Sequence, residues 1–149
     1  MKLEFRSAVP EDAGACIDLR GRTRQNAFSE EALAELGITR ATWAEGIRDG
    51  SCPGHVCQSE GCVVGMAFAD RDSGEVVVVA VLPEFEGLGI GKRLLEDTLQ
   101  DLKTHGHKRS FLGCNADPSS RSHGFYRSLG WCPTGEFDTL GDEVLAREL

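Results

Sequence analysis

Long apolar runs are missing from this sequence, and this absence excludes one class of protein at once. No stretch approaches the roughly 20 consecutive apolar residues with which a helix spans a bilayer. The first residues, Met1-Lys2-Leu3-Glu4-Phe5-Arg6, lack the charged and then apolar layout of a secretion signal. We therefore expect a cytoplasmic protein without a membrane partner.

Basic side chains are also scarce. The chain has 16 lysines and arginines against 24 aspartates and glutamates, which gives a formal net charge of -8 at pH 7. Nucleic acids and anionic membranes are bound by neutralising phosphates, so an acidic chain without a long Lys/Arg run matches neither. The same excess of negative charge would attract a cationic amine.

Cysteine pairs of the CxxC type, which hold zinc in many small proteins, are absent. Three of the 6 cysteines, Cys52, Cys57 and Cys62, are evenly spaced, and His55 lies between the first two. These four side chains leave a metal or redox site open as one interpretation. We favour the other, which is small buried or half-buried thiols in a cytosolic protein, and expect no metal.

Linkers, repeats and low-complexity tracts are missing too, so the 149 residues form one domain, 1–149, with its own core. Alternating apolar residues predict strands, and apolar residues three or four apart predict helices. In chain order we expect a strand over 3–9, helices from Pro10, over 29–37 and from Thr39 or Thr42 to Gly50, strands over 55–59, 62–69 and 75–82, a helix over 90–103, a strand over 110–114, a helix over 117–130, and strands over 131–137 and 143–147. This order indicates a mixed α/β fold around a central sheet.

The strongest of these strands is Glu75–Leu82, an almost unbroken apolar run rich in valine. Such a run predicts burial on both faces of a sheet. Pro83 ends the strand, because proline cannot donate a hydrogen bond to the strand ladder.

The segment Glu86-Gly87-Leu88-Gly89-Ile90-Gly91-Lys92 joins this strand to the most amphipathic predicted helix. Three glycines at alternate positions let the backbone turn tightly and approach a ligand closely. The free N–H groups of the first helical turn, the helix dipole, and Lys92 with Arg93 would then favour a phosphate or pyrophosphate. A purely structural turn is the alternative. The GxGxG pattern, in mid-chain, fits neither the GxGxxG of dinucleotide folds nor the Gly-Lys-Ser/Thr of a Walker loop.

The pattern Val81-x-Pro83-x-x-x-Gly87-x-Gly89-x-Gly91 resembles the acetyl-CoA loop of the GNAT (Gcn5-related) N-acetyltransferases. The block 125–131, Phe-Tyr-Arg-Ser-Leu-Gly-Trp, resembles the FYxxLGF block of that superfamily, and the opening 5–12 resembles its first strand and helix. The resemblance implies a central, mostly antiparallel twisted sheet with splayed central strands, flanked by helices. It also implies direct transfer of an acetyl group from acetyl-CoA to a primary amine, without an acyl-enzyme.

The expected acceptor is a small-molecule amine, such as an amino acid or a related metabolite. The alternatives are a protein N-terminus or lysine as acceptor, and a catalytically silent sensor that only binds acyl-CoA. The resemblance leaves a homodimer open as the assembly.

The resemblance places the coenzyme along two adjoining segments. The pantetheine arm would pair with the strand before the loop, where the N–H of Val81 or Leu82 would polarise the thioester carbonyl. Tyr126, the single tyrosine, would protonate the departing thiolate, although a core-packing role is the alternative. The coenzyme-binding residues implied in this way are Ala80, Val81, Leu82, Glu86, Gly87, Leu88, Gly89, Ile90, Gly91, Lys92 and Tyr126.

Glu86 departs from the family pattern, in which Gln or Arg usually precedes the first glycine. A carboxylate that faces a pyrophosphate is repelled by about 1–4 kcal/mol at a few ångströms. We therefore expect Glu86 to turn away from the phosphates, toward Lys92 or Arg93, and backbone N–H groups to carry the binding.

The acceptor ammonium must lose a proton before it can attack. Glu75 aligns with a glutamate that the histone-acetyltransferase branch of the superfamily uses as the base, and its valine neighbours would raise its pKa. A solvated strand end is the plainer interpretation, since many relatives use a water chain. Asp70 is the second candidate for the base.

Other charged residues are candidates for binding the acceptor. Arg20 and Arg24 fall where the first helices of the family form one wall of the acceptor site, and guanidinium groups suit a carboxylate. Asp70 or Glu75 would suit the ammonium group of the same molecule. His123, on the helix of Tyr126, would shuttle a proton or contact the substrate. Solvated surface side chains are the alternative for the two arginines and for His123.

Overall fold

The computed structural model describes residues 2–23 and 28–149. Seven strands and five α-helices, with two short 3-10 turns, follow one another within these ranges. They are β1 (Leu3–Ser7), α1 (Ala13–Arg20), α2 (Glu30–Glu35), α3 (Arg40–Asp49), β2 (Gly54–Ser59), β3 (Cys62–Ala69), β4 (Val76–Val81), α4 (Ile90–Thr104), β5 (Arg109–Cys114), α5 (Arg121–Ser128), β6 (Cys132–Phe137) and β7 (Glu143–Glu148). Every strand and helix predicted from the sequence is present, so local periodicity was sufficient to find them.

Polar caps set the ends of several helices. The hydroxyl of Thr39 accepts the N–H of Thr42 at 3.1 Å and starts α3, and Gly50 ends it at φ 81°. The predicted start of α5 at 117 is wrong, because Ser120 caps this helix by accepting the N–H of His123 at 3.3 Å. Asp117 instead closes a turn before it, where its carboxylate accepts the N–H of Ser119 at 2.9 Å.

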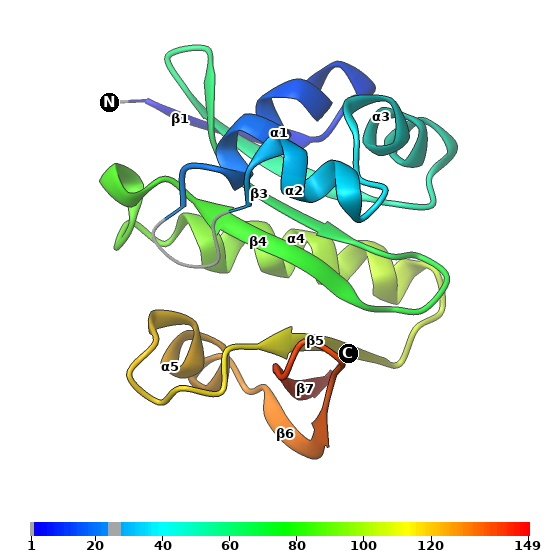
Figure 1. Cartoon of the computed structure of the whole chain (residues 1–149), viewed down its shortest axis with the longest axis vertical. Helices are drawn as coiled ribbons and strands as arrows, with labels where there is room; N and C mark the ends of the chain where they lie inside the picture. Colours follow the sequence, from blue (N-terminus) through cyan, green and yellow to red (C-terminus); the bar gives the residue numbers. More distant parts are fainter. Residues whose placement is uncertain (1, 24–27) are drawn as a thin grey trace.

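The strands form two antiparallel sheets. One has the order β1-β2-β3-β4 and the other the order β5-β7-β6, and Figure 1 shows the two sheets diverging between β4 and β5. The two strands at the divide are parallel and meet in a single isolated bridge, between Glu75 and Phe111. The expected mixed sheet with splayed central strands is therefore confirmed.

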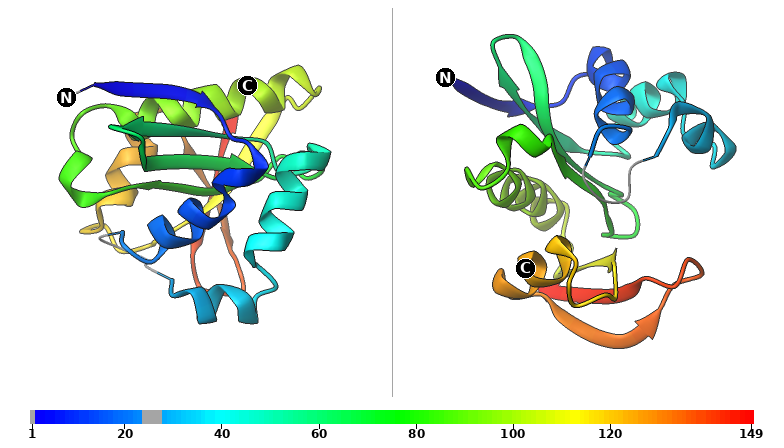
Figure 2. Two further views of the ribbon diagram at one scale, coloured as in Figure 1. Left: turned by 90° about the horizontal axis from the view of Figure 1, so that it is seen from above. Right: turned by 60° about the vertical axis from the view of Figure 1, so that its left-hand side comes forward.

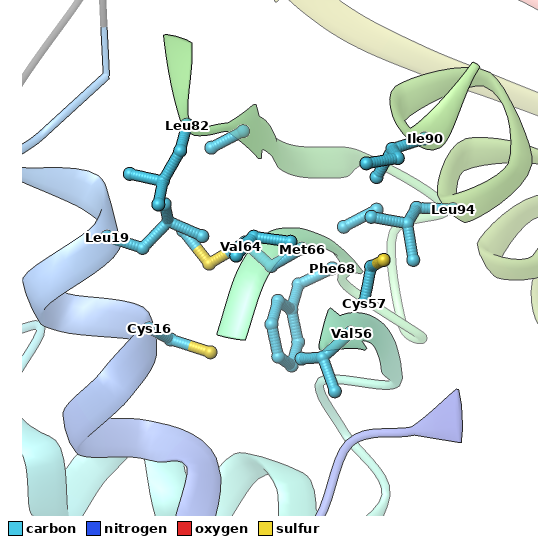
Figure 3. Close-up of a cluster of buried hydrophobic side chains, with 12 residues drawn as sticks. Cys16, Leu19, Val56, Cys57, Val64, Met66, Phe68, Leu82, Ile90 and Leu94 are labelled. Atoms are coloured by element: carbon cyan, nitrogen blue, oxygen red, sulfur yellow. The ribbon is translucent and has the colours of Figure 1, made fainter. Parts of the chain in front are cut away.

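Helices cover both faces of the four-stranded sheet (Figure 2). Helix α4 packs against β2, β3 and β4 on one face, while α1 packs against β3 and β4 on the other and is itself covered by α3. Figure 3 shows the resulting core, in which Cys16 and Leu19 of α1 approach the strands from one side and Ile90 and Leu94 of α4 from the other. This packing fixes the start of α4, and with it the glycine loop, against β4.

The valine-rich strand β4 is less buried than its sequence suggests. Val76 and Ala80 are 4% and 5% exposed, but Val77 is 46% exposed. The predicted burial on both faces is therefore wrong at Val77. The physical reason is that Val77 borders the open space where β4 and β5 diverge beyond the Glu75 bridge. Within 2–23 and 28–149, no helix is long and apolar enough to cross a membrane.

Candidate active site

A cavity of about 430 Å³ lies where β4 and β5 diverge. Its walls come from the strands at the divide, from the glycine loop with the first turn of α4, from α5, and from the end of α1 with the residues that follow it. The residues that line it are Arg20, Thr23, Val76–Val81, Phe85, Glu86, Gly87, Gly89–Lys92, Leu112–Asn115, Arg121, Ser122, Phe125 and Tyr126. The cavity thus joins the glycine loop to the single tyrosine.

The backbone of β4 presents one edge to this cavity. The N–H of Leu82 donates to the carbonyl of Val64 in β3 at 2.9 Å. Hydrogen-bonding direction alternates along a strand, so in the β3–β4 register the N–H groups of Val79 and Val81 point away from β3, toward β5. Because Leu82 is engaged in the sheet and is 7% exposed outside the cavity wall, only Val81 of the two predicted donors can serve a ligand there.

The glycine loop needs its glycines for backbone geometry. Gly87 and Gly89 have φ values of 80° and 81°, in the left-handed region that favours glycine, and Gly89 is the N-cap of α4. The first bond across the start of the helix runs from the N–H of Arg93 to the carbonyl of Gly89 at 3.1 Å. The N–H groups of the preceding turn therefore have no partner within the helix, and several of them border the cavity. Leu88 is 51% exposed and lies outside the cavity wall.

Gly91 lies between Phe125 of α5 and Val81 of β4. A side chain at this position would begin 3.5 Å from the ring of Phe125 and 3.7 Å from Val81. Any residue larger than alanine would therefore extend between these two walls. The third glycine of the motif keeps the cavity open where the other two shape its backbone.

Glu86 has a different partner from the one predicted. Its Oε2 lies 3.5 Å from Nε of Arg121, at the start of α5. Arg93 is engaged elsewhere, with its guanidinium 4.1 Å from the centre of the Phe5 ring and 3.9 Å from the Asp97 carboxylate. The predicted pairing with Lys92 or Arg93 is therefore wrong, because α5 supplies a cation from a distant part of the chain. Glu86 also remains in the cavity wall.

Tyr126 is buried at the wall of the cavity between aromatic neighbours. Its ring makes edge-to-face contacts with Phe125 and Trp131, at centroid distances of 5.0 and 6.0 Å. Burial is the main reason that its pKa is raised, with a smaller contribution from Cys114. The hydroxyl group therefore stays protonated at neutral pH and can donate a hydrogen bond into the cavity.

Glu75 lies at the closed end of the divide, in the bridge to β5, and is not part of the cavity wall. Its carboxyl pKa is raised by burial first, and then by the nearby carboxylates of Asp70 and Asp138. Asp70 is also outside the wall. Its carboxylate closes the turn before β4 by accepting the N–H of Asp72 at 2.9 Å. Of the two candidate bases, Glu75 is thus the one in contact with both strands of the divide.

The predicted acceptor-binding residues are separated by the structure. Arg20 lines the cavity with its guanidinium 4.7 Å from the centre of the Phe28 ring, and burial lowers its pKa. His123 is half-buried on α5 but is not part of the wall, and Arg24 lies outside the described residues. Only Arg20 of these three is therefore seen at the cavity.

The cysteines and His55 do not gather into one cluster. His55 pairs with Asp101 of α4, Nε2 to Oδ2 at 2.7 Å. Cys57 is buried on the α4 side, near Arg93, whereas Cys52 lies against Gly46 of α3, and Cys62 is exposed. In the part of the chain that the structure describes, no three His, Cys, Asp or Glu side chains are placed to hold a metal ion. The evenly spaced thiols give no support to the metal hypothesis.

Several wall residues were not anticipated from the sequence. Arg121 and Ser122 each lie one helical turn before a wall aromatic, Phe125 and Tyr126, so spacing around the FYxxLGF block could have found both. Asn115 and Thr23 also line the cavity, and neither carries a local signal of its own. They reach the site only through the packing of β5 and α1.

The model of the acetyltransferase (GNAT) family matches residues 15–131. No curated protein sequence matches the chain. Among solved structures, the PaiA N-acetyltransferase from Thermoplasma acidophilum, in complex with coenzyme A, is 18% identical with a TM-score of 0.82, and 100% of each chain is covered. The ribosomal-protein-S18-alanine N-acetyltransferase from Escherichia coli is 19% identical with a TM-score of 0.71, covering 99% of this chain and 94% of that one. Ard1 from Thermoplasma volcanium is 16% identical with a TM-score of 0.72, covering 100% and 99%.

Proposed function

We propose that this chain, which belongs to the GNAT acetyltransferase family, transfers the acetyl group of acetyl-CoA directly to the primary amine of a small molecule. The observation that carries the proposal is the cavity between β4 and β5, which has the glycine loop, the open edge of β4, Tyr126 and Arg20 in one continuous wall. The glycine loop, the open edge of β4 and Tyr126 suit a thioester whose carrier bears phosphate groups. Arg20 adds a positive charge to the same wall.

The chain's groups fit coenzyme A part by part. The free N–H groups at the start of α4 suit the pyrophosphate, and the positive end of the helix dipole favours the same charge. The outward N–H groups of Val79 and Val81 suit the amides and the carbonyl of the pantetheine arm, as an added strand would. We assign the thioester carbonyl to the N–H of Val81, which would stabilise the tetrahedral oxyanion.

The reaction then needs one proton removed and one bond broken. The amine nitrogen attacks the thioester carbon, the carbon–sulfur bond breaks, and the electron pair of that bond stays on the sulfur. We assign Tyr126 to this sulfur. Its raised pKa makes complete proton transfer to a thiolate unfavourable, so its hydroxyl acts as a hydrogen-bond donor to the leaving group rather than as a strong acid.

We assign Glu75 as the base for the amine proton. A carboxylate with a raised pKa holds a proton better than an ordinary one, and Glu75 owes that rise to burial, Asp70 and Asp138. Because Glu75 is outside the cavity wall, water must carry the proton from the amine to the carboxylate. The proton leaves Glu75 to solvent before the next turnover.

Arg20 supports an acceptor that carries a carboxylate as well as an amine. Its guanidinium is half-buried in the wall and stacks on Phe28, so it is held in place before a ligand arrives. A protein N-terminus is the second candidate acceptor, since the Escherichia coli neighbour of the same fold is named for the alanine of a ribosomal protein. An acyl-CoA sensor without turnover is the third candidate. The free cysteines suit a cytoplasmic location for all three.

A panel of amines tests these proposals. Acetyl-CoA turnover is followed by thiol release with free amino acids, with the same molecules as decarboxylated amines, and with peptides that begin with alanine or contain lysine. We expect the amino acids to react best, and Arg20→Gln to raise their KM about tenfold while leaving the decarboxylated amines unchanged. Faster turnover of peptides would overturn the small-molecule proposal. Tight CoA binding without turnover of any amine would favour the sensor.

A further inference from the structure

A buried hydroxyl group joins the two sheets at the closed end of the divide. Ser110, the second residue of β5, is 0% exposed, and its Oγ donates to the carbonyl of Gly74 at 2.7 Å. The next residue on each side, Glu75 and Phe111, forms the isolated bridge between the sheets. Ser110 lies outside the cavity wall, so it can act on the cavity only through the residues that it holds.

The turn that carries Glu75 is closed by hydrogen bonds of its own. The N–H of Glu75 donates to the hydroxyl of Ser73 at 3.2 Å, and the carbonyl of Glu75 accepts the N–H of Asp70 at 2.7 Å. The N–H of Gly74 donates to the carbonyl of Asp70 at 2.9 Å. Because these bonds are internal, they shape the turn but do not fix where it lies relative to β5.

Two contacts from β5 and the residues just before it fix that position. One is the hydroxyl of Ser110, and the other is the ring of His107, which hydrogen-bonds to the carbonyl of Arg71. The turn packs closely here, since a side chain at Gly74 would begin 3.3 Å from the carbonyl oxygen of Arg109. His107 is half-buried, whereas Ser110 and Gly74 are both buried. Loss of the Ser110 bond would therefore leave a carbonyl that water cannot readily satisfy.

Two carboxylates face that of Glu75, one from each sheet. Asp70 belongs to the same turn, and Asp138 follows β6 in the three-stranded sheet. The Oδ2 atom of Asp138 lies against β5, where a side chain at Gly113 would begin only 2.6 Å from it. Asp138 is thus placed by β5, and Ser110 places Glu75 on the same strand. The distance between these two carboxylates therefore depends on the Ser110 bond.

We infer that Ser110 is a positioning residue of the active site, whose hydroxyl holds the Glu75 turn against β5 and so fixes the Glu75 carboxylate at the closed end of the cavity. This inference rests on the proposed function, in which Glu75 receives the amine proton through water. Such a path depends on distance, and a displacement of about 1 Å lowers the rate. The coenzyme is proposed to bind farther along β4 and at the glycine loop, so Ser110 does not affect its affinity.

The pH dependence of turnover by the full chain, at saturating acetyl-CoA and with the amino acid that reacts best in the panel above, tests this role. Ser110→Ala should lower kcat about fivefold at neutral pH, less than the loss of the Glu75 carboxylate itself. The acidic limb of its profile should move to lower pH, because a carboxylate that is less buried and farther from Asp138 has a lower pKa. Ser110→Cys keeps a weaker donor and should give an intermediate profile. Titration calorimetry should show unchanged CoA affinity in both variants.

Thr98→Val is the matched control. Thr98 is also 0% exposed, and its hydroxyl donates to the carbonyl of Leu94 at 2.9 Å within α4. This variant loses a buried hydroxyl away from the divide, so its thermal unfolding should resemble that of Ser110→Ala, while kcat and the acidic limb should stay those of the wild type. In the Glu75→Gln background, Ser110→Ala should not lower kcat further, because the carboxylate through which it acts is already lost.

A measurement without turnover separates the inference from the proposed function. The carboxyl carbon of Glu75 is titrated by NMR, and its signal is identified by its absence from the spectrum of Glu75→Gln. The pKa of Glu75 should be lower in Ser110→Ala than in the wild type and unchanged in Thr98→Val. If this shift is seen but no amine is acetylated, the proposed function fails and the positioning of Glu75 by Ser110 stands.

Several results would overturn the inference. An unchanged pKa of Glu75 in Ser110→Ala would show that the hydroxyl does not fix the carboxylate. A fall in kcat that leaves the acidic limb in place, or that adds to the fall in Glu75→Gln, would contradict a role through Glu75. An equal shift of the limb in Thr98→Val would mean that loss of any buried hydroxyl has this effect. If Glu75→Gln removes the limb and Ser110→Ala matches the wild type, only this inference fails.

Discussion

The two edges of β4 meet different surroundings. Its edge toward β3 is hydrogen-bonded, as the contact from Leu82 to the Val64 carbonyl at 2.9 Å illustrates, and this edge belongs to a core that α1 and α4 close on either side. Its edge toward β5 is bridged only at Glu75 and then faces a cavity. Strand β4, which consists of five valines and an alanine, therefore has a structural edge toward β3 and an open edge toward β5.

The difference underlies the proposed use of the β4 backbone as a binding surface. An unpaired strand edge is normally a liability, because its N–H and C=O groups can pair with any other chain. Here the divergence of β4 and β5 limits access to the open edge to a ligand that enters a cavity of about 430 Å³. Under the proposed function, the hydrogen-bonded edge positions the strand and the open edge binds the ligand.

Proline substitutions at two neighbouring residues should remove an N–H group from each edge of β4 separately. Leu82→Pro removes a hydrogen bond to β3 and a buried side chain, and should destabilise the fold by about 3 kcal/mol in chemical denaturation. Val81→Pro removes an N–H that faces the cavity. It should cost less stability than Leu82→Pro but lower turnover about a hundredfold, as loss of an oxyanion donor does.

Val81→Ala is the control for these prolines, because it shortens the side chain and keeps the N–H. It should retain most of the activity of the wild type. Equal destabilisation by the two prolines would show that the edges of β4 do not differ as described.

The variant Tyr126→Phe tests the part of the cavity wall that α5 supplies. The Tyr126 hydroxyl has no hydrogen-bond partner among the described residues, so its removal should leave the free energy of unfolding nearly unchanged. Turnover should fall by about a hundredfold if this hydroxyl stabilises the departing thiolate. Steady-state kinetics at saturating acetyl-CoA measures the fall, and wild-type turnover in the variant would remove Tyr126 from the mechanism.

Glu75→Gln should have the smallest effect and a characteristic pH dependence. The carboxylate accepts a proton only when it is ionised, so activity falls as the pH drops through its pKa, which lies above the ordinary value of 4.5. Glu75→Gln should lower turnover about tenfold at neutral pH and remove this acidic limb from the profile. Asp70→Asn should shift the limb to lower pH, because one repelling charge is lost.

Glu136→Gln is the control for that profile, since Glu136 is an exposed acid on β6. The acidic limb of the pH profile of Glu136→Gln should coincide with that of the wild type. An unchanged limb in Glu75→Gln would mean that another group or a water chain takes the amine proton.

Local signals in the sequence predicted most of the fold. The helices that begin near residues 29 and 39, the strands 55–59 and 62–69 and the glycine loop each depend on residues close together in the chain, and all are found in the structure. The errors concern neighbours from elsewhere. Val77 is exposed because it borders the cavity between β4 and β5, and Glu86 pairs with Arg121 because the start of α5 lies beside the loop.

By itself the sequence determined the elements, the glycine loop and the likeness to an acetyltransferase family, because periodicity, glycine placement and capping act over a few residues. Only the tertiary structure decided which edge of β4 is open, and that Val81 rather than Leu82 offers its N–H to the cavity. It also decided that Arg20 and Tyr126 line the same cavity. These facts depend on how β4 and β5 diverge. Strand pairing is set by the packing of whole elements, which no short stretch of sequence specifies.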